Sequence, residues 1–256
     1  MSQKIEILPT DALLHVDVQT TFMPGGGLAV KDGDKILPAV LALHTRFDLC
    51  ALQQDHDACC RIYATLDQHP YGHISLASSY VGLPPYMQLD ERTVWGWTQK
   101  RHGIAPGALF DLHQLRKYLG EVKVQTLWPD HGIAGTAEAD LHPRLYEAQG
   151  HFDFVLVKGY EATCDSYSGF RDNLKQTTGL ADTMRDHGIE RVFVDGLAFD
   201  FCVGWSALDA VAEGFAEVYV IEDATRSVDL PGTVVKMRAD LASAGVRLIR
   251  STDILD

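Results

Sequence analysis

The chain has 256 residues, of which 46% are hydrophobic and 22% charged, and these proportions are ordinary for a soluble globular protein. Its 22 Lys and Arg residues stand against 35 Asp and Glu, which gives a net charge of −13. This balance disfavours nucleic acid or an anionic membrane as a partner, because their phosphates would repel such a surface, whereas a small neutral substrate is compatible with it.

Short apolar runs alternate with helical patterns along the chain, which predicts an α/β fold with a mainly parallel sheet. Six runs are rich in β-branched or aromatic residues, as strands buried on both faces should be. The predicted strands span 12–18, 60–66, 152–157, 191–197, 217–222 and 246–250. The predicted helices span about 34–53, 179–187, 203–213 and 231–244.

Residues from about 74 to 127 interrupt this alternation and include a Pro84-Pro85 pair. The stretch is too long for an ordinary connection between two elements. We therefore predict an ordered insertion, at about 79–126, that covers one end of the sheet within a single domain spanning 1–256.

The number and spacing of the cysteines indicate the redox state of the cellular compartment. There are five cysteines, an odd number without regular spacing, at Cys50, Cys59, Cys60, Cys164 and Cys202. This pattern fits a reducing compartment better than a disulfide framework. The sequence also shows no apolar run long enough for a membrane span and no features of a secretory signal. We expect a cytoplasmic protein.

Four predicted strands are followed by reactive side chains. Asp17 closes the first strand, Asp67 and His69 follow the second, Lys158 follows the third, and Cys202 lies just past the fourth. Ligands of open parallel sheets bind beyond the carboxyl ends of the strands. We therefore expect these side chains to meet at one edge of the sheet.

Cys202, Asp17 and Lys158 would form a sensible nucleophilic unit. The start of a helix and a nearby ammonium would favour the Cys202 thiolate. The carboxylate could accept the thiol proton and pass it to a leaving amine. Taken singly, each residue has a plainer interpretation: a small buried hydrophobe for the cysteine, a cap or ion pair for the aspartate, and a side chain reaching solvent for the lysine.

Asp67, His69 and His131 could ligate a divalent metal. One carboxylate and two imidazoles leave coordination positions open on Zn²⁺, Fe²⁺ or Mn²⁺, of which zinc is the first choice. An Asp-x-His pair alone also occurs by chance or in a surface turn. His73 and His102 are expected to be hydrogen-bonding or surface histidines instead.

Three aromatic residues, Phe22, Trp128 and Tyr167, lie beside these candidates in the sequence. Each is more often a core residue when judged singly. Together they suggest a flat aromatic slot for a substrate.

The residues that carry these predictions stand in five motifs, HVDVQTTFMPGGGLAV, TLDQHPYGHISLAS, LWPDHGIAGTAEADLHP, LVKGYEATCDSYSGFRDN and GLAFDFCVGWSALDA. In their order and over nearly the whole chain, they resemble the isochorismatase-like cysteine hydrolases, and within them the metal-dependent nicotinamidases. The region 79–126 resembles the family least. The resemblance implies a three-layer α/β sandwich in which a mainly parallel six-stranded sheet carries helices on both faces.

The resemblance also implies roles. Cys202 is the nucleophile, Asp17 the proton carrier and Lys158 the catalytic lysine, while Asp67, His69 and His131 hold the metal and Trp128 and Tyr167 face the substrate. It further implies a cis peptide before Ala198, so that the N–H groups of Ala198 and Cys202 form an oxyanion hole. The expected reaction is hydrolysis of nicotinamide to nicotinate and ammonia, in NAD salvage.

Three positions depart from the family pattern. Thr21 stands where the family usually has an aspartate, Gly132 replaces a cysteine that often follows the third metal ligand, and Phe199 stands where a threonine is common. Thr21 is expected to alter hydrogen bonding near the metal without removing a named catalytic group.

Other functions stay open from the sequence. The same fold could act on another small amide or carbamoyl compound, or the chain could be a non-catalytic metal- or ligand-binding protein. A thiol redox protein would want a C-x-x-C pair, which Cys59-Cys60 does not supply. A homo-oligomer is compatible with the sequence.

Overall fold

The computed structural model describes residues 4–54, 59–97, 103–147 and 151–255. A six-stranded sheet forms its centre, with strand order β5-β2-β1-β6-β7-β8. All five strand pairings are parallel. The strands are β1 (Asp11–Val16), β2 (Arg61–Asp67), β5 (Phe154–Lys158), β6 (Arg191–Leu197), β7 (Glu217–Arg226) and β8 (Arg247–Ile249). The six predicted strands are confirmed; the largest difference is β7, which runs four residues further than predicted.

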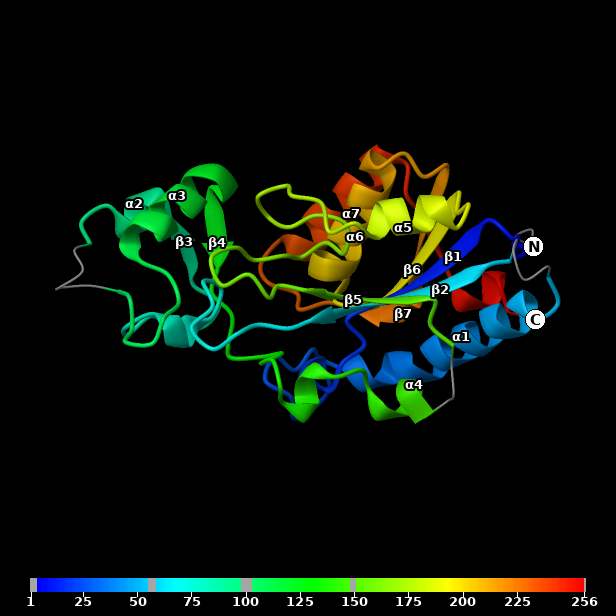
Figure 1. Cartoon of the computed structure of the whole chain (residues 1–256), viewed down its shortest axis with the longest axis horizontal. Helices are drawn as coiled ribbons and strands as arrows, with labels where there is room; N and C mark the ends of the chain where they lie inside the picture. The colour runs from blue at the N-terminus through cyan, green and yellow to red at the C-terminus, as the bar shows by residue number, and fades with distance from the viewer. Residues whose placement is uncertain (1–3, 55–58, 98–102, 148–150, 256) are drawn as a thin grey trace.

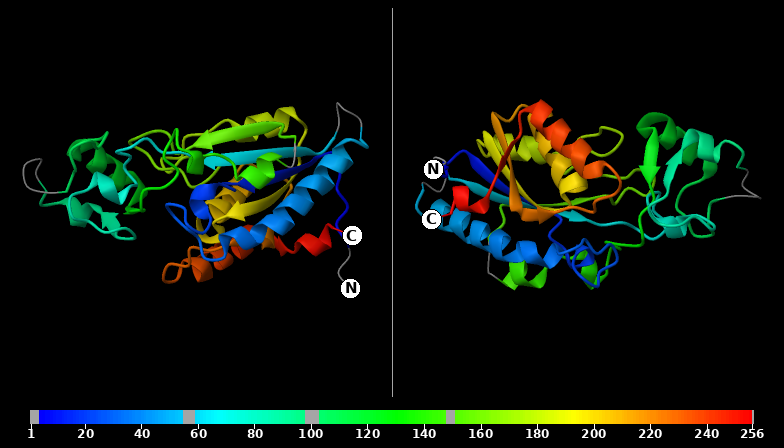
Figure 2. Two further views of the ribbon diagram at one scale, coloured as in Figure 1. Left: turned by 90° about the horizontal axis from the view of Figure 1, so that it is seen from below. Right: turned by 180° about the vertical axis from the view of Figure 1, so that it is seen from behind.

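Helices cover both faces of this sheet, as predicted. One face carries α1 (Leu37–Ala51), and the other carries α5 (Leu180–Asp186), α6 (Gly204–Ala212) and α7 (Thr233–Ala244) (Figures 1 and 2). A further short helix, α4 (Pro143–Glu147), lies on the α1 side and was not predicted (Figure 1). The three-layer α/β architecture is therefore confirmed.

The two apolar layers follow from the alternation of side chains along each strand. In β1, Leu13 packs into the core with Phe47 of α1, whereas its neighbour Leu14 packs into a second core with Ala207 of α6. Neither face of the strand is exposed to water. This explains why the strand sequences are continuously apolar instead of alternating between apolar and polar residues.

The predicted insertion forms a small lobe at one end of the molecule (Figure 1). It contains β3 (Gln88–Asp90), α2 (Glu91–Val94), α3 (Leu112–Val122) and β4 (Val124–Thr126), and β3 and β4 pair antiparallel. These elements enclose a third apolar core that includes Leu89, Leu115 and Leu119. The described residues of the small lobe therefore have an apolar core of their own, and none of its elements was predicted.

The start of α3 shows why this lobe can fold locally. Asp111 accepts a hydrogen bond from the Gln114 backbone N–H, and the Gln114 side chain accepts one from Asp111 N, each at 2.8 Å. This reciprocal capping box satisfies two backbone donors that the helix cannot satisfy itself.

The remaining helical segments are single turns at Thr20–Phe22, Gly33–Ile36, Ala77–Ser79, Ala137–Ala139 and Ser251–Asp253, and a π-helical turn at Phe199–Val203. None of the helices in the described part of the chain is both long and apolar enough to cross a membrane.

Candidate active site and metal centre

The reactive side chains predicted from four strands do meet at the carboxyl ends of the sheet. Asp67 and Lys158 are the last residues of β2 and β5 and are register partners. Asp17 follows β1 in a left-handed conformation, with φ of 50°. Cys202 lies in the π-helical turn between β6 and α6. All four side chains are buried.

Lys158 lies at the centre of this group. Its Nζ is 2.9 Å from Asp17 Oδ2, 2.9 Å from Asp67 Oδ1 and 3.5 Å from Cys202 Sγ. It also donates to the backbone oxygen of Ser166 at 3.0 Å. One ammonium therefore contacts the candidate nucleophile, the candidate proton carrier and a candidate metal ligand at once.

The charges of these groups depend on one another. Burial opposes the charge of the Lys158 ammonium, but the carboxylates of Asp17 and Asp67 outweigh burial and raise its pKa well above the usual range. Burial is also the largest effect on Asp17 and raises the pKa of its carboxyl despite Lys158. A carboxyl with a raised pKa is a better proton acceptor than an ordinary aspartate.

The surroundings of the Cys202 thiol act on its pKa in opposite directions. Lys158 does act to lower its pKa, as expected, but burial and the carboxylates of Asp17 and Asp67 outweigh that effect and raise the pKa well above the usual value. The lowering effect of the ammonium is the part that the sequence predicted; the opposing effects of burial and of the two carboxylates were not considered. The Cys202 thiol is hydrogen-bonded to the side chain of Asp17, a group that can accept a proton.

Two residues that sequence reasoning missed hold the aspartates in place. Thr65 Oγ1 donates to Asp17 Oδ1 at 2.6 Å, and Gln19 Oε1 accepts from Asp67 N at 2.8 Å. Thr65 could have been noticed as a polar residue inside an apolar strand, because such a residue needs a buried partner.

The turn that carries Cys202 is held by Asp200. The peptide between Leu197 and Ala198 is cis, as the resemblance implied. Asp200 accepts hydrogen bonds from the N–H groups of Val228 and Asp229, both at 2.9 Å, and so fixes the turn against the loop after β7.

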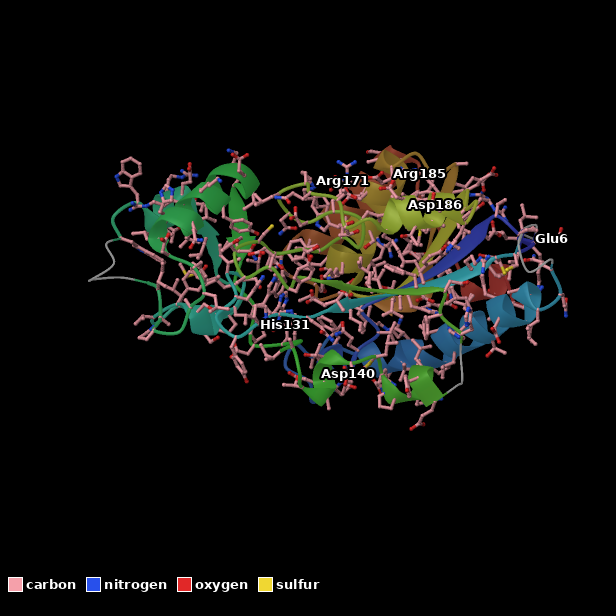
Figure 3. All side chains as sticks on the ribbon, viewed as in Figure 1. Glu6, His131, Asp140, Arg171, Arg185 and Asp186 are labelled. Atoms are coloured by element: carbon pink, nitrogen blue, oxygen red, sulfur yellow. The ribbon has the colours of Figure 1, made fainter. Side chains whose placement is uncertain are left out.

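Asp67, His69 and His131 converge as a potential metal site. Their ligand atoms all lie within 4.8 Å of one another, and Nε2 of His69 and of His131 lie 3.0 and 3.1 Å from Asp67 Oδ2. His131 lies at the end of the sheet that faces the small lobe (Figure 3).

The donor set fits a cation. His69 Nδ1 lies 2.8 Å from Gly159 O, and His131 Nδ1 lies 2.8 Å from Pro129 O. Because a carbonyl oxygen only accepts, each Nδ1 carries a proton, so that Nε2 of each ring is the nitrogen directed at Asp67. Acceptors facing a carboxylate require a proton or a metal ion between them. Burial disfavours a proton on His69, but Asp67 raises the pKa of His69 to about 9.

His73 forms hydrogen bonds, as expected. Its Nδ1 lies 2.8 Å from Ser75 Oγ, its Nε2 lies 3.2 Å from Cys164 O, and its ring stacks on His69. It also belongs, with His69 and Asp165, to a second group of potential ligand atoms. His102 lies outside the described residues.

An aromatic cavity opens beside Cys202. The predicted Phe22, Trp128 and Tyr167 line it, together with Ala198. Phe201, which sequence reasoning missed, lines it as well. The full lining is Phe22, Leu28, Asp67, His69, Trp128, His131, Asp165, Tyr167, Ala198, Phe201, Cys202 and Val228.

Phe201 changes the expected slot into a cluster of rings. It meets Trp128 edge-to-face, with centroids 4.8 Å apart, and Tyr167 with centroids 5.5 Å apart. Trp128 Nε1 donates to the Tyr167 hydroxyl at 3.3 Å. The sequence signal that could have identified Phe201 was its position next to Cys202. The direction of its side chain was not predictable, because its backbone is non-helical, with φ of −132° and ψ of −106°.

Two of the departures from the family pattern are in contact with each other. Gly132 N donates to Thr21 Oγ1 at 3.0 Å. A Cβ at Gly132 would lie 2.4 Å from Asp67 O, and its φ of +54° is one that L side chains rarely adopt. In this chain a cysteine at position 132 would not fit without a backbone shift. The third departure, Phe199, is buried beneath Arg238.

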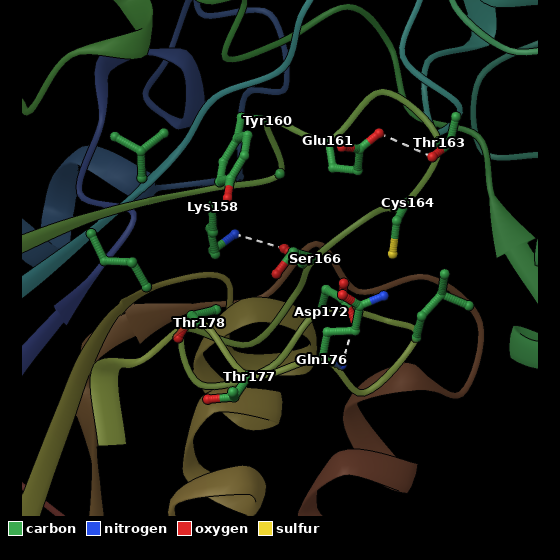
Figure 4. Close-up of a pocket in the computed structure, with 14 residues that line it drawn as sticks. Lys158, Tyr160, Glu161, Thr163, Cys164, Ser166, Asp172, Gln176, Thr177 and Thr178 are labelled. Carbon is green, nitrogen blue, oxygen red and sulfur yellow. Dashed lines mark hydrogen bonds between the residues drawn. The ribbon is translucent and has the colours of Figure 1, made fainter. Parts of the chain in front are cut away.

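A second cavity, of about 340 Å³, lies on the other side of Lys158 (Figure 4). The segment 164–167 separates the two cavities: Cys164 and Ser166 line this one, whereas Asp165 and Tyr167 line the aromatic one. Lys158 and Ser166 point toward each other at the boundary (Figure 4).

Comparisons with known proteins identify the family of this chain. The Isochorismatase domain model matches residues 109–253. A curated nicotinamidase from Acinetobacter baylyi is 35% identical over 95% of this chain and 94% of its own length. The solved nicotinamidase/pyrazinamidase of Acinetobacter baumannii has a TM-score of 0.75 at 34% identity and covers 96% of this chain and 98% of its own.

A pyrazinamidase of Pyrococcus horikoshii, solved in complex with zinc, has a TM-score of 0.63 at 26% identity and covers 94% of this chain and 99% of its own. The family match spans more than half of the chain, and the sequence relatives span nearly all of it. This chain belongs to the isochorismatase-like hydrolase family.

Proposed function

We propose that this protein is a nicotinamidase, which hydrolyses nicotinamide to nicotinate and ammonia in NAD salvage in the cytoplasm. The observation that carries the proposal is the contact of one buried ammonium, Lys158, with Cys202, Asp17 and Asp67. The Lys158 ammonium thus contacts the proposed nucleophile, the proposed base and a proposed metal ligand, beside an aromatic cavity. Cys50, Cys60, Cys164 and Cys202 form no disulfide within the described residues, which supports the reducing compartment.

The reaction begins with proton transfer from Cys202 to Asp17, the base whose pKa burial has raised. The sulfur attacks the carboxamide carbon, and the N–H groups of Ala198 and Cys202 donate to the developing oxyanion. Lys158 keeps its charge while Asp17 carries the thiol proton, because the Asp67 carboxylate still pairs with the ammonium. The Lys158 ammonium therefore stabilises the thiolate as it forms.

Collapse of the tetrahedral intermediate breaks the carbon–nitrogen bond. Asp17 returns its proton to the leaving nitrogen, so that ammonia departs and a thioester to Cys202 is left. Asp17 then takes a proton from water, whose oxygen attacks the thioester carbon. Nicotinate leaves, and the proton returns to the Cys202 sulfur.

We assign Asp67, His69 and His131 as the residues that would hold one divalent metal ion. Bound there, the ion would supply a Lewis acid for the pyridine nitrogen of the substrate. Zinc is our first choice, since the three donors suit it and a zinc complex is known for the Pyrococcus relative.

The cavity supports a flat aromatic amide as substrate. Phe22, Trp128, Tyr167 and Phe201 offer ring faces and edges against which a pyridine ring can pack. The names of the Acinetobacter relatives support nicotinamide as that amide.

The test is ammonia release from nicotinamide by the metal-loaded protein, with and without a chelator. We expect turnover that the chelator abolishes and that added Zn²⁺, Fe²⁺ or Mn²⁺ restores. Cys202→Ala should abolish turnover and keep the metal, whereas Cys164→Ala, a buried cysteine that lines the other cavity, should keep both. Release from another small amide but not from nicotinamide would overturn the assignment of substrate; activity retained by Cys202→Ala would overturn the mechanism.

A further inference from the structure

The proposed reaction gives the small lobe no role, because none of the assigned residues lies in β3, α2, α3 or β4. Two polar side chains of the lobe are nevertheless buried: Tyr118 of α3 is 2% exposed and Gln125 of β4 is 1% exposed. Buried polar groups need hydrogen-bond partners. The partners of these two residues connect the lobe to the aromatic cavity.

The Gln125 carboxamide has a partner for each of its polar atoms. Its Nε2 donates to Asp165 Oδ2 at 2.9 Å and to the backbone oxygen of Thr126 at 2.7 Å. Its Oε1 accepts from the Tyr118 hydroxyl at 2.5 Å. Because both N–H groups and the oxygen are engaged, the carboxamide is held in one orientation, in which a donor faces Asp165.

Asp165 is a buried residue that lines the aromatic cavity. Its Oδ2 accepts from Gln125, and its Oδ1 accepts from the backbone N–H of Ser166 at 2.8 Å. Both donors are neutral, and burial makes a carboxylate depend on such donors. Loss of the Gln125 carboxamide would therefore leave the Asp165 side chain free to change its position.

The Tyr118 hydroxyl is connected to the cavity by a second route. It accepts from Asn173 Nδ2 at 3.3 Å, and Asn173 Oδ1 accepts from the Tyr167 backbone N–H at 3.4 Å. The backbone N–H of Asn173 donates to the backbone oxygen of Asp165 at 2.9 Å. One hydroxyl of the small lobe is thus connected to both Asp165 and Tyr167, and both of these residues line the aromatic cavity.

Trp128 attaches the same two parts of the chain to each other. It follows Gln125 by three residues, lines the cavity, and donates from Nε1 to the Tyr167 hydroxyl at 3.3 Å. The segment that leaves the lobe therefore holds the segment 165–167 at two points, through Gln125 and through Trp128.

We propose that Tyr118 and Gln125 are positioning residues, through which the small lobe fixes the wall of the aromatic cavity formed by Asp165 and Tyr167. Neither lines the cavity, so both act through other residues. A wall that is fixed before binding loses less conformational entropy when a flat ring packs on it, which favours affinity. The inference rests on the proposed function, because it concerns the fit of nicotinamide or a similar aromatic amide.

The first test is the kinetics of nicotinamide hydrolysis by Tyr118→Phe, which removes the hydroxyl that both routes share. Tyr80→Phe is the matched control: Tyr80 packs in the same core, is 4% exposed, and donates from its hydroxyl to the backbone oxygen of Ile74 at 2.7 Å. We expect similar losses of Tm in the two variants. Only Tyr118→Phe should raise KM, by at least about threefold and with kcat within about twofold, because the loss concerns binding and not chemistry. Equal KM values in the two variants, or a fall in kcat without a rise in KM, would overturn the proposal.

The second test needs no substrate. Hydrogen exchange of the Ser166 and Tyr167 amides reports on their hydrogen bonds to the side chains of Asp165 and Asn173. We expect severalfold faster exchange of both amides in Tyr118→Phe, but not in Tyr80→Phe. Gln125→Met, which keeps the length of the side chain and removes the carboxamide, should speed exchange of the Ser166 amide.

The two tests separate the inference from the proposed function. Unchanged exchange in Tyr118→Phe and Gln125→Met would overturn the inference even if nicotinamide is hydrolysed. If the unsubstituted protein releases no ammonia from nicotinamide, the proposed function fails, whereas the exchange rates still decide whether the lobe holds the wall of the cavity.

Discussion

Asp67 and Lys158 end neighbouring parallel strands as register partners, and Lys158 Nζ lies 2.9 Å from Asp67 Oδ1. The same ammonium lies 2.9 Å from Asp17 Oδ2. A single cation therefore compensates a carboxylate on the proposed metal side and another on the proposed nucleophile side. The two halves of the site depend electrostatically on one residue.

Lys158→Met should strongly destabilise the protein. It leaves Asp17 and Asp67 buried without their ammonium, and breaking a buried ion pair in this way costs about 3–5 kcal/mol. Lys236→Met, which breaks an exposed pair with Asp240, should cost at most about 1 kcal/mol. Urea unfolding at neutral pH measures both. Equal losses in the two variants would show that Lys158 does not compensate the buried carboxylates.

The destabilised Lys158→Met variant should recover stability as the pH falls. Burial already raises the pKa of Asp17 above that of the unfolded chain, and loss of the ammonium raises it further. The folded state then binds protons that the unfolded state does not, so its stability rises with falling pH. Unfolding free energies of the variant relative to the unsubstituted protein, measured from about pH 8 to pH 5, test this direction. If the difference in unfolding free energy between the two proteins grew as the pH fell, this prediction would be contradicted.

Gly159→Ala should release the proposed metal. A Cβ at Gly159 would lie 2.6 Å from His69 Cε1 and 2.9 Å from Asp67 Oδ1, and the residue has φ of +72°. Gly188→Ala is the control, because its φ is +73° and a Cβ there would meet nothing within 4 Å. Both variants should lose about 1–2 kcal/mol from backbone strain, but only Gly159→Ala should lose bound metal by elemental analysis. Full metal content in Gly159→Ala would contradict the assignment of Asp67, His69 and His131 as the metal site.

Phe201→Leu should weaken binding of an aromatic amide. Phe201 lines the cavity and packs edge-to-face on Trp128, and such ring contacts contribute about 0.5–1.5 kcal/mol. We expect KM for nicotinamide to rise severalfold with a smaller change in kcat. Trp95→Leu, at an aromatic residue that is 82% exposed on the small lobe, should leave both constants unchanged. A fall in kcat alone would instead indicate that Phe201 positions Cys202.

His44 should make the protein less stable in acid. Burial, followed by the charge of His15, lowers the pKa of His44 to about 3 from an ordinary value of 6.5. Between these values the unfolded chain binds a proton that the folded chain does not, so stability falls with falling pH by up to about 1.4 kcal/mol per unit. His44→Gln should reduce this slope. Exposed His113→Gln is the control, and an unchanged slope in His44→Gln would disprove the assignment.

The sequence alone was sufficient to predict the strands of the parallel sheet. It was also sufficient to predict that four side chains lie close together at one edge of that sheet, namely Asp17, Asp67, Lys158 and Cys202. Strands buried on both faces are apolar throughout, and parallel strands deliver their final residues to one edge. The roles of these residues remain predictions, but their proximity did not require homology.

Other features depended on tertiary structure. Phe201 enters the cavity because its backbone leaves the helical conformation, which no periodicity reveals. The net raised pKa of the Cys202 thiol follows from burial beside two carboxylates, whereas the sequence suggested only the opposing ammonium. In the small lobe, β3, α2 and β4 were missed because each has at most four residues. The longer helix α3 was missed although Asp111 and Gln114 form a capping box at its start.

The segment 164–167 alternates its side chains between two cavities, with Cys164 and Ser166 on one side and Asp165 and Tyr167 on the other. Loss or gain of a single residue here would exchange these sides. A hydroxyl or thiol would then face the pocket beside Cys202, and the aromatic ring would face away from it. Among relatives, the length of this segment should therefore be a better marker of a retained aromatic pocket than the identity of any one of its residues.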